Sequence, residues 1–115
     1  MRIEIHCPQS IKASEECRVR ALLINDGYQP VEVSRNAFVG PNVQELASTG
    51  SPRPDSVEPT FGGAEQPLTL QPFTFYGRER TFSNVAVGEL KISATYRGSG
   101  VETVSASQSM RVDPP

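Results

Sequence analysis

The sequence predicts an all-β fold: an antiparallel β-sandwich of about seven strands in a single domain spanning residues 1–115, with at most one short helical turn. Apolar and polar residues alternate with a period of two along most of the chain, as expected for strands that bury one face. Helical periodicity is almost absent, so no helices are expected to cover a parallel sheet. The 10 prolines and 9 glycines divide the 115 residues into short elements joined by turns.

The first two strands are expected at residues 2–7 and 17–25, where apolar residues recur at every second position. If these strands are antiparallel neighbours, Cys7 and Cys17 face each other near the connecting loop, with Cα atoms within the roughly 4.4–6.8 Å that a disulfide requires. The alternative is two free, half-buried thiols in a reducing compartment. The number of cysteines does not distinguish these two states.

The stretch Asn25-Asp26-Gly27 separates the second strand from a third one at residues 31–34. Residues 28–30 make this connection longer than a two-residue hairpin. Gly27 can adopt a positive φ, and Asn25 or Asp26 can form an Asx-turn. We therefore expect a corner at which the chain crosses from one sheet to another. A calcium site is not expected, because Asp26 alone cannot supply the roughly six to eight oxygen ligands.

The middle of the chain is less regular. The segment from Pro41 to Ala47 has helix-like apolar spacing and is expected to form about two turns. Residues 47–66 form a long irregular loop, and such loops are either functional or disordered. In one interpretation Phe61 inserts into a partner, with Arg53 nearby; in the other, Phe61 packs back on the sandwich from a mobile insertion. We expect this loop to be mobile in the free protein.

A strand over residues 73–82 begins with 3 aromatic residues in 4 positions. Alternation sends Phe75 and Tyr76 to opposite faces of this strand. A bulge at Gly77 would reset the register so that Phe82 enters the core. Tyr76, together with two arginines of this strand, either forms an interface patch or covers the edge of the core.

The clearest strand is expected at residues 89–96, with alternating core residues Leu90, Ile92, Ala94 and Tyr96. Residues 98–100 read Gly-Ser-Gly, which is typical of a hairpin turn. A last strand is expected at residues 101–112, followed by a tail at residues 113–115. A short strand at residues 68–70 completes the set.

Three stretches resemble the immunoglobulin-like and fibronectin type III-like sandwich modules of bacterial proteins. They are Leu23–Gly27 followed by Pro30–Val33, Leu68-x-Leu70-x-Pro72, and Gly88–Tyr96. The resemblance covers most of residues 3–112 but fails over residues 36–66. It implies an immunoglobulin-like antiparallel β-sandwich. Such modules mostly act as adhesion units, spacers or binding accessories, so the function it implies is an analogy at the level of the fold.

Residues suited to catalysis are scarce. His6 and Cys7 are neighbours in an expected strand, so their side chains point to opposite faces and do not meet. Glu15 and Glu16 are a turn pair, and no two acids are expected on one rigid face. No phosphate-binding glycine loop or zinc-ligand spacing occurs, so we expect no enzyme activity, metal or cofactor. The net charge of −2 is scattered, which argues against nucleic acid. No apolar run approaches the roughly 20 residues of a membrane span.

We therefore expect a non-catalytic interaction or accessory module that binds a protein partner through its end loops. The candidate partner-binding residues are Arg53, Phe61, Tyr76, Arg78 and Arg80. The alternative is a protease inhibitor that presents residues 47–66 and 98–100 to a protease cleft. Residues 1–6 begin directly with strand-like alternation and contain no signal peptide, so the chain either stays inside the cell or is a domain excised from a secreted or surface protein.

Overall fold

A computed structural model describes residues 1–46, 50–55, 67–98 and 100–115. Within these residues the chain forms nine strands: β1 (Arg2–His6), β2 (Ser10–Lys12), β3 (Cys17–Ile24), β4 (Val31–Ser34), β5 (Phe38–Glu45), β6 (Pro67–Leu70), β7 (Phe75–Phe82), β8 (Gly88–Tyr96) and β9 (Val104–Asp113). The one helical element among them is a 3₁₀ turn, η1 (Arg35–Ala37). The predicted all-β class and the single short helical turn are confirmed.

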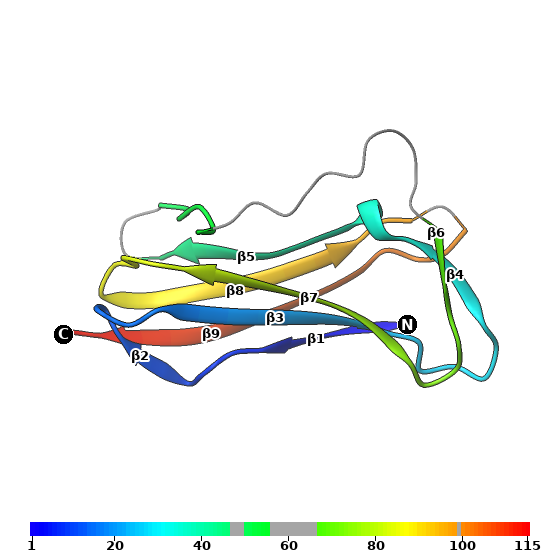
Figure 1. Ribbon diagram of the computed structural model, residues 1–115, viewed down its shortest axis with the longest axis horizontal. Coiled ribbons are helices and arrows are strands. Elements are labelled where there is room, and N and C mark those ends of the chain that lie inside the picture. Colours follow the sequence, from blue (N-terminus) through cyan, green and yellow to red (C-terminus); the bar gives the residue numbers. More distant parts are fainter. Residues whose placement is uncertain (47–49, 56–66, 99) are drawn as a thin grey trace.

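The strands form two packed sheets and a small terminal pair (Figure 1). One sheet has the order β1-β3-β7, the other β2-β9-β8-β5, and β4 pairs with β6. The pairings are antiparallel except for β2 with β9, which is parallel. In Figure 1 the β4–β6 pair lies at the end of the molecule that holds the N-terminus, and β2 lies at the opposite end with the C-terminus.

The strand number is nine rather than about seven. The two strands that the sequence did not indicate are β2, which is only 3 residues long, and β5. The last strand also continues through Asp113, which pairs with Lys12 of β2, so the expected tail is shorter by one residue.

The expected helical turns from Pro41 to Ala47 are wrong, because residues 38–45 form β5 and pair with β8. The register of this pair shifts between Val39 and Asn42. Gly40 lies in the shift with φ 111°, and a Cβ added there would meet the carbonyl oxygen of Ser93 at 2.8 Å. The shift places Phe38 and Val43 in the core although they are five positions apart, which hides the period of two.

The core between the sheets consists of two clusters. The first contains Ile11, Cys17, Val19, Val43, Phe82, Val85, Leu90, Ile92, Met110 and Val112. The second contains Ile3, Ala21, Leu23, Val33, Phe38, Leu70, Ala94 and Tyr96. The predicted alternation of β8 is confirmed, since all four of its expected core residues are buried. The terminal pair is joined to this core by the Ser34 amide, which donates to the Tyr96 hydroxyl at 2.9 Å.

The expected bulge at Gly77 is wrong. The β3–β7 register runs without a shift from Cys17 opposite Phe82 to Ile24 opposite Phe75. Phe82 needs no shift to enter the core, because it lies an even number of residues from the half-buried Tyr76. Gly77 instead makes room for its cross-strand neighbour Leu22, whose Cδ2 would lie 2.9 Å from an added Cβ.

Candidate functional site

The β3–β4 and β6–β7 connections meet at the end of the molecule that holds the β4–β6 pair (Figure 1). Asn25 joins them. Its side chain is only 2% exposed, and its amide nitrogen donates to the carbonyls of Gln29 (2.8 Å) and Leu70 (3.0 Å). Its side-chain oxygen accepts from the amide of Gly27 (3.0 Å), which is the expected Asx-turn. The predicted corner, where the chain leaves β3 for a strand outside that sheet, is confirmed.

The same corner fixes the start of β7. The backbone amide of Asn25 donates to the Thr74 carbonyl at 3.0 Å, and the backbone carbonyl of Asn25 accepts from the Phe73 amide at 2.7 Å. The Thr74 amide and hydroxyl both donate to the Gln71 carbonyl. Phe73 is held by these bonds with φ 62°, a left-handed conformation that costs a residue with a Cβ about 1–2 kcal/mol.

Three large aromatic side chains are exposed at this corner: Tyr28 is 84% exposed, Phe73 64% and Phe75 59%. The rings of Tyr28 and Phe73 are perpendicular, with centroids 5.3 Å apart and an interplanar angle of 83°. Phe75 follows at the first position of β7, on its outer face, opposite Ile24. We call these three residues the aromatic corner. Backbone strain of the kind seen at Phe73 concentrates at functional sites.

The charges next to the aromatic corner are paired. The Asp26 carboxylate lies 3.1 Å from the amino group of Met1 and 3.8 Å from Nε of Arg2. The hydrogen bond from the Met1 amino group lowers the pKa of Asp26, with help from the charges of that amino group and of Arg2. The surface that the three rings offer is therefore apolar and carries no unpaired carboxylate from this turn.

Tyr76, Arg78 and Arg80 lie on the inward-facing side of β7 and are half-buried. Arg78 donates to the carbonyl of Phe38, and Arg80 donates to the carbonyl of Pro41 at 3.3 Å and to the side chain of Asn42 at 3.1 Å. The Tyr76 ring packs on Phe38, with centroids 6.0 Å apart. These contacts join β7 to β5 across the two sheets, and they favour the interpretation in which Tyr76 covers the edge of the core.

Residues 50–55 of the predicted loop are attached to the sandwich. The Asp55 amide donates to the Thr81 carbonyl at 2.8 Å, and the Asp55 carboxylate accepts from the amide (3.1 Å) and hydroxyl (2.7 Å) of Ser83. These hydrogen bonds attach residues 50–55 of the predicted mobile loop to β7 and to the residue that follows it. Arg53 is exposed within it. Phe61 lies outside the described residues, as do residues 47–49 and the rest of 56–66.

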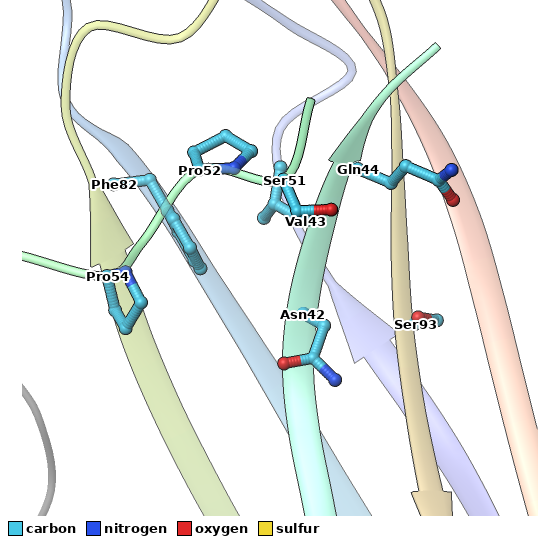
Figure 2. A pocket seen from close by; sticks show the side chains of 8 residues that line it. All are labelled: Asn42, Val43, Gln44, Ser51, Pro52, Pro54, Phe82 and Ser93. Carbon is cyan, nitrogen blue, oxygen red and sulfur yellow. The ribbon is translucent and has the colours of Figure 1, made fainter. Parts of the chain in front are cut away.

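A pocket of about 290 Å³ lies where this segment passes β5 (Figure 2). It is lined by Asn42, Val43, Gln44, Ser51, Pro52, Pro54, Phe82 and Ser93. In Figure 2 the two prolines and Phe82 lie on one side of β5, and Gln44 and Ser93 lie on the other. Among the described residues of the lining, the polar side chains are two carboxamides and two serine hydroxyls.

Both cysteines are free thiols. Cys7 follows β1 directly, so an extension of the β1–β3 register places it opposite Val19, diagonal to Cys17. Diagonal positions lie about 7–8 Å apart, beyond bridging distance. Burial raises the pKa of Cys17 to about 11, with a smaller contribution from Cys7, and burial also raises the pKa of Cys7. This geometry favours the alternative of two free thiols.

His6 and Cys7 are separated as predicted: His6 is exposed beside Glu4, with Nε2 3.6 Å from its carboxylate, whereas Cys7 packs against the first core cluster. In the described ranges, no three residues of the His, Cys, Asp and Glu types are grouped so as to hold a metal ion. No helix in the same ranges is long and apolar enough to cross a membrane. Comparison of the sequence with protein-family models and with curated proteins found no match.

Sequence reasoning missed all three residues of the aromatic corner, Tyr28, Phe73 and Phe75, as candidate site residues. Tyr28 lies in the connection between β3 and β4, outside any alternation of apolar and polar residues. Its position outside a strand pattern was the one signal in the sequence that it could be exposed. Phe73 was grouped with a strand, but the strand begins two residues later.

Proposed function

We propose that this protein is a non-catalytic interaction module that binds a protein partner through the aromatic corner. One observation carries the proposal: three large aromatic rings stay exposed, and Phe73 is held in a strained conformation by the hydrogen bonds around Asn25. Each Phe or Tyr ring can bury about 150–250 Å² on contact with a partner. Replacing these three residues by polar ones would be expected to increase the stability of the domain, so stability alone does not explain them.

The strand arrangement supports the finer part of the proposal, which is that the sandwich is immunoglobulin-like. Its two packed sheets, with an N-terminal segment shared between them through β1 and β2, suit that architecture. Sandwiches of this kind present their connections at the two ends, where binding sites form on a rigid scaffold. The aromatic corner lies at such an end.

The chemistry of the corner favours a protein as the partner. Aromatic residues are enriched at the centres of protein–protein interfaces, where they fill pockets on the partner. The rings of Tyr28 and Phe73 are perpendicular and do not form one flat platform, which suits insertion into an apolar pocket of the partner. The pairing of Asp26 with Met1 and Arg2 removes one obstacle to burial, since an unpaired carboxylate is costly to cover.

The test uses Phe73→Gly, which removes the ring and relieves the positive φ, so that the fold is retained. Val87→Ala is the matched control, because Val87 is also an exposed apolar residue but belongs to another connection. Proteins captured by the wild-type chain are purified, and their affinities are measured by isothermal titration calorimetry. We expect Phe73→Gly to weaken binding by at least about tenfold and Val87→Ala to leave it unchanged. Equal affinity of both variants would refute the proposal.

The protease-inhibitor alternative is tested by a panel of serine, cysteine and metalloproteases. Of the residues it relies on, 47–49, 56–66 and 99 lie outside the described part, and no contact of the described residues favours it. Stoichiometric inhibition that survives Phe73→Gly would replace the interaction proposal with this one.

A further inference from the structure

The open edge of β7 has a defined hydrogen-bonding pattern. β7 is the last strand in the order β1-β3-β7, so only one of its sides is paired within that sheet. The bond from the Asn25 amide to the Thr74 carbonyl shows that the even-numbered residues of β7 direct their backbone groups toward β3. The odd-numbered residues therefore direct theirs outward. The Thr81 carbonyl confirms this, because it accepts from Asp55, which lies outside the sheet.

One described segment already uses this edge. Asp55 binds the Thr81 carbonyl and thereby occupies the end of β7 nearest β5. Toward the aromatic corner, the outward amides and carbonyls of Phe75, Gly77 and Glu79 have no backbone partner among the described residues. This leaves a row of alternating donors and acceptors spaced for an extended chain.

The other long edge of the sandwich, formed by β5, is protected against pairing by its backbone. The edge formed by β7 is not protected in this way. The edge of β5 contains Pro41, which lacks an amide hydrogen, and a register shift; the carbonyl of Pro41 is bound by Arg80, and the amide of Glu45 by Gly50. Natural proteins protect exposed edges by such prolines, bulges and shortening. β7 is 8 residues long, has an unbroken register, and contains neither proline nor lysine. Inward-facing charges also protect edges, and β7 carries two of them, Arg78 and Arg80. Both donate to carbonyls of β5, so they do not occupy the outward backbone groups of Phe75, Gly77 and Glu79.

We infer that the open edge of β7 binds an extended peptide segment of a partner protein, which adds to the sheet as a further strand. Main-chain hydrogen bonds to Phe75, Gly77 and Glu79 would supply the affinity, as in other cases of strand addition. The exposed Phe75 ring lies beside Gly77, where Leu22 fills the space of a side chain, so the peptide residue that packs on this ring is apolar. This edge shares Phe75 with the aromatic corner, but its hydrogen bonds do not involve Tyr28 or Phe73, so either proposal can hold without the other.

The free edge is tested first in the unliganded chain by amide hydrogen exchange. The amides of Gly77 and Glu79 are expected to exchange much faster than those of Tyr76 and Arg78, which bond to β3. Equal protection of the two pairs would show that the edge is already occupied and would overturn the inference.

Peptide binding is tested with linear peptides selected from a displayed library against the whole chain. Glu79→Pro removes the outward donor together with the carboxylate that pairs with Arg18 and Arg20, and proline is tolerated where an edge amide faces solvent. Glu79→Ala is the matched control, since it removes the same exposed carboxylate and keeps the amide. We expect selected peptides to protect the Gly77 amide, to lose at least about tenfold in affinity with Glu79→Pro, and to bind Glu79→Ala as they bind the wild type.

A second measurement covers the case in which Glu79→Pro unfolds the chain, which a thermal melt reveals. Two peptides are made, one methylated at its odd-numbered backbone nitrogens and one at its even-numbered ones, so that each lacks half of the donors. Only the set that faces β7 is needed, so methylation is expected to abolish binding to the wild-type protein in one of these two registers only. Binding that resists methylation in both registers would overturn the inference. So would peptides whose affinity falls with Phe73→Gly but not with Glu79→Pro, because these bind the aromatic corner.

Discussion

Replacing Asn25 by alanine tests the link between the corner and the aromatic rings. The side chain is 2% exposed and makes three hydrogen bonds, to Gln29, Leu70 and Gly27, at 2.8–3.0 Å. Each bond contributes about 0.5–1.5 kcal/mol, and a buried carbonyl left without a donor costs about 1–3 kcal/mol. Because the Leu70 carbonyl lies in the buried part of the corner, we expect Asn25→Ala to lower the free energy of unfolding by about 3 kcal/mol.

The assay is equilibrium unfolding in urea, with Gln44→Ala as the control, because Gln44 is exposed on β5. A loss of stability shows as a lower midpoint with an unchanged slope. Tyrosine fluorescence in the native baseline is expected to change as well, because Tyr28 loses the turn that holds it beside Phe73. A loss below about 1 kcal/mol would refute the reasoning, since it would mean that the carbonyls of Gln29 and Leu70 find other donors.

Three further predictions concern the core, the anchored loop segment and a buried thiol. Ile92→Ala should cost about 2–4 kcal/mol, because Ile92 is fully buried, and Lys91→Ala, on the other face of β8, should cost little in the same urea experiment. Asp55→Ala should cost about 1–2 kcal/mol by thermal unfolding, because the Ser83 amide and hydroxyl lose their acceptor, whereas the exposed Arg53→Ala should be neutral. Cys17 has a pKa raised from 9.0 to about 11, so its contribution to stability is complete below pH 9 and is lost as the pH rises through about 11. Unfolding midpoints measured across this pH range should fall less steeply for Cys17→Ala, and equal slopes would contradict the raised pKa.

The parts of the fold that follow a period of two could be predicted from the sequence. The alternation of β8 and the turn chemistry of Asn25 and Gly27 are local signals, and local sequence is enough to read them. β5 was missed because its register shift moves Phe38 and Val43 out of phase. β2 was missed because 3 residues cannot show a period.

The candidate site was harder to predict, because exposure of an aromatic residue depends on distant segments. The surroundings of Phe73 include Asn25, which lies 48 positions earlier and binds its amide. Arg78 and Arg80 were expected to bind a partner because arginine is enriched at interface hot spots. Their partners on β5 lie about 40 positions away in the chain and could not be identified without the register.

The parallel pairing of β2 with β9 also determines the order in which the molecule can assemble. Ser10–Lys12 pair with Arg111–Asp113. The edge strand β2 therefore cannot pair until residues about a hundred positions later in the chain have been synthesised. During synthesis, β1 and β3 can pair early, but β2 has no partner until β9 has left the ribosome. Nascent chains arrested before β9 should therefore remain open to proteases at residues 8–16, and protection there should arrive in one step once β9 has emerged.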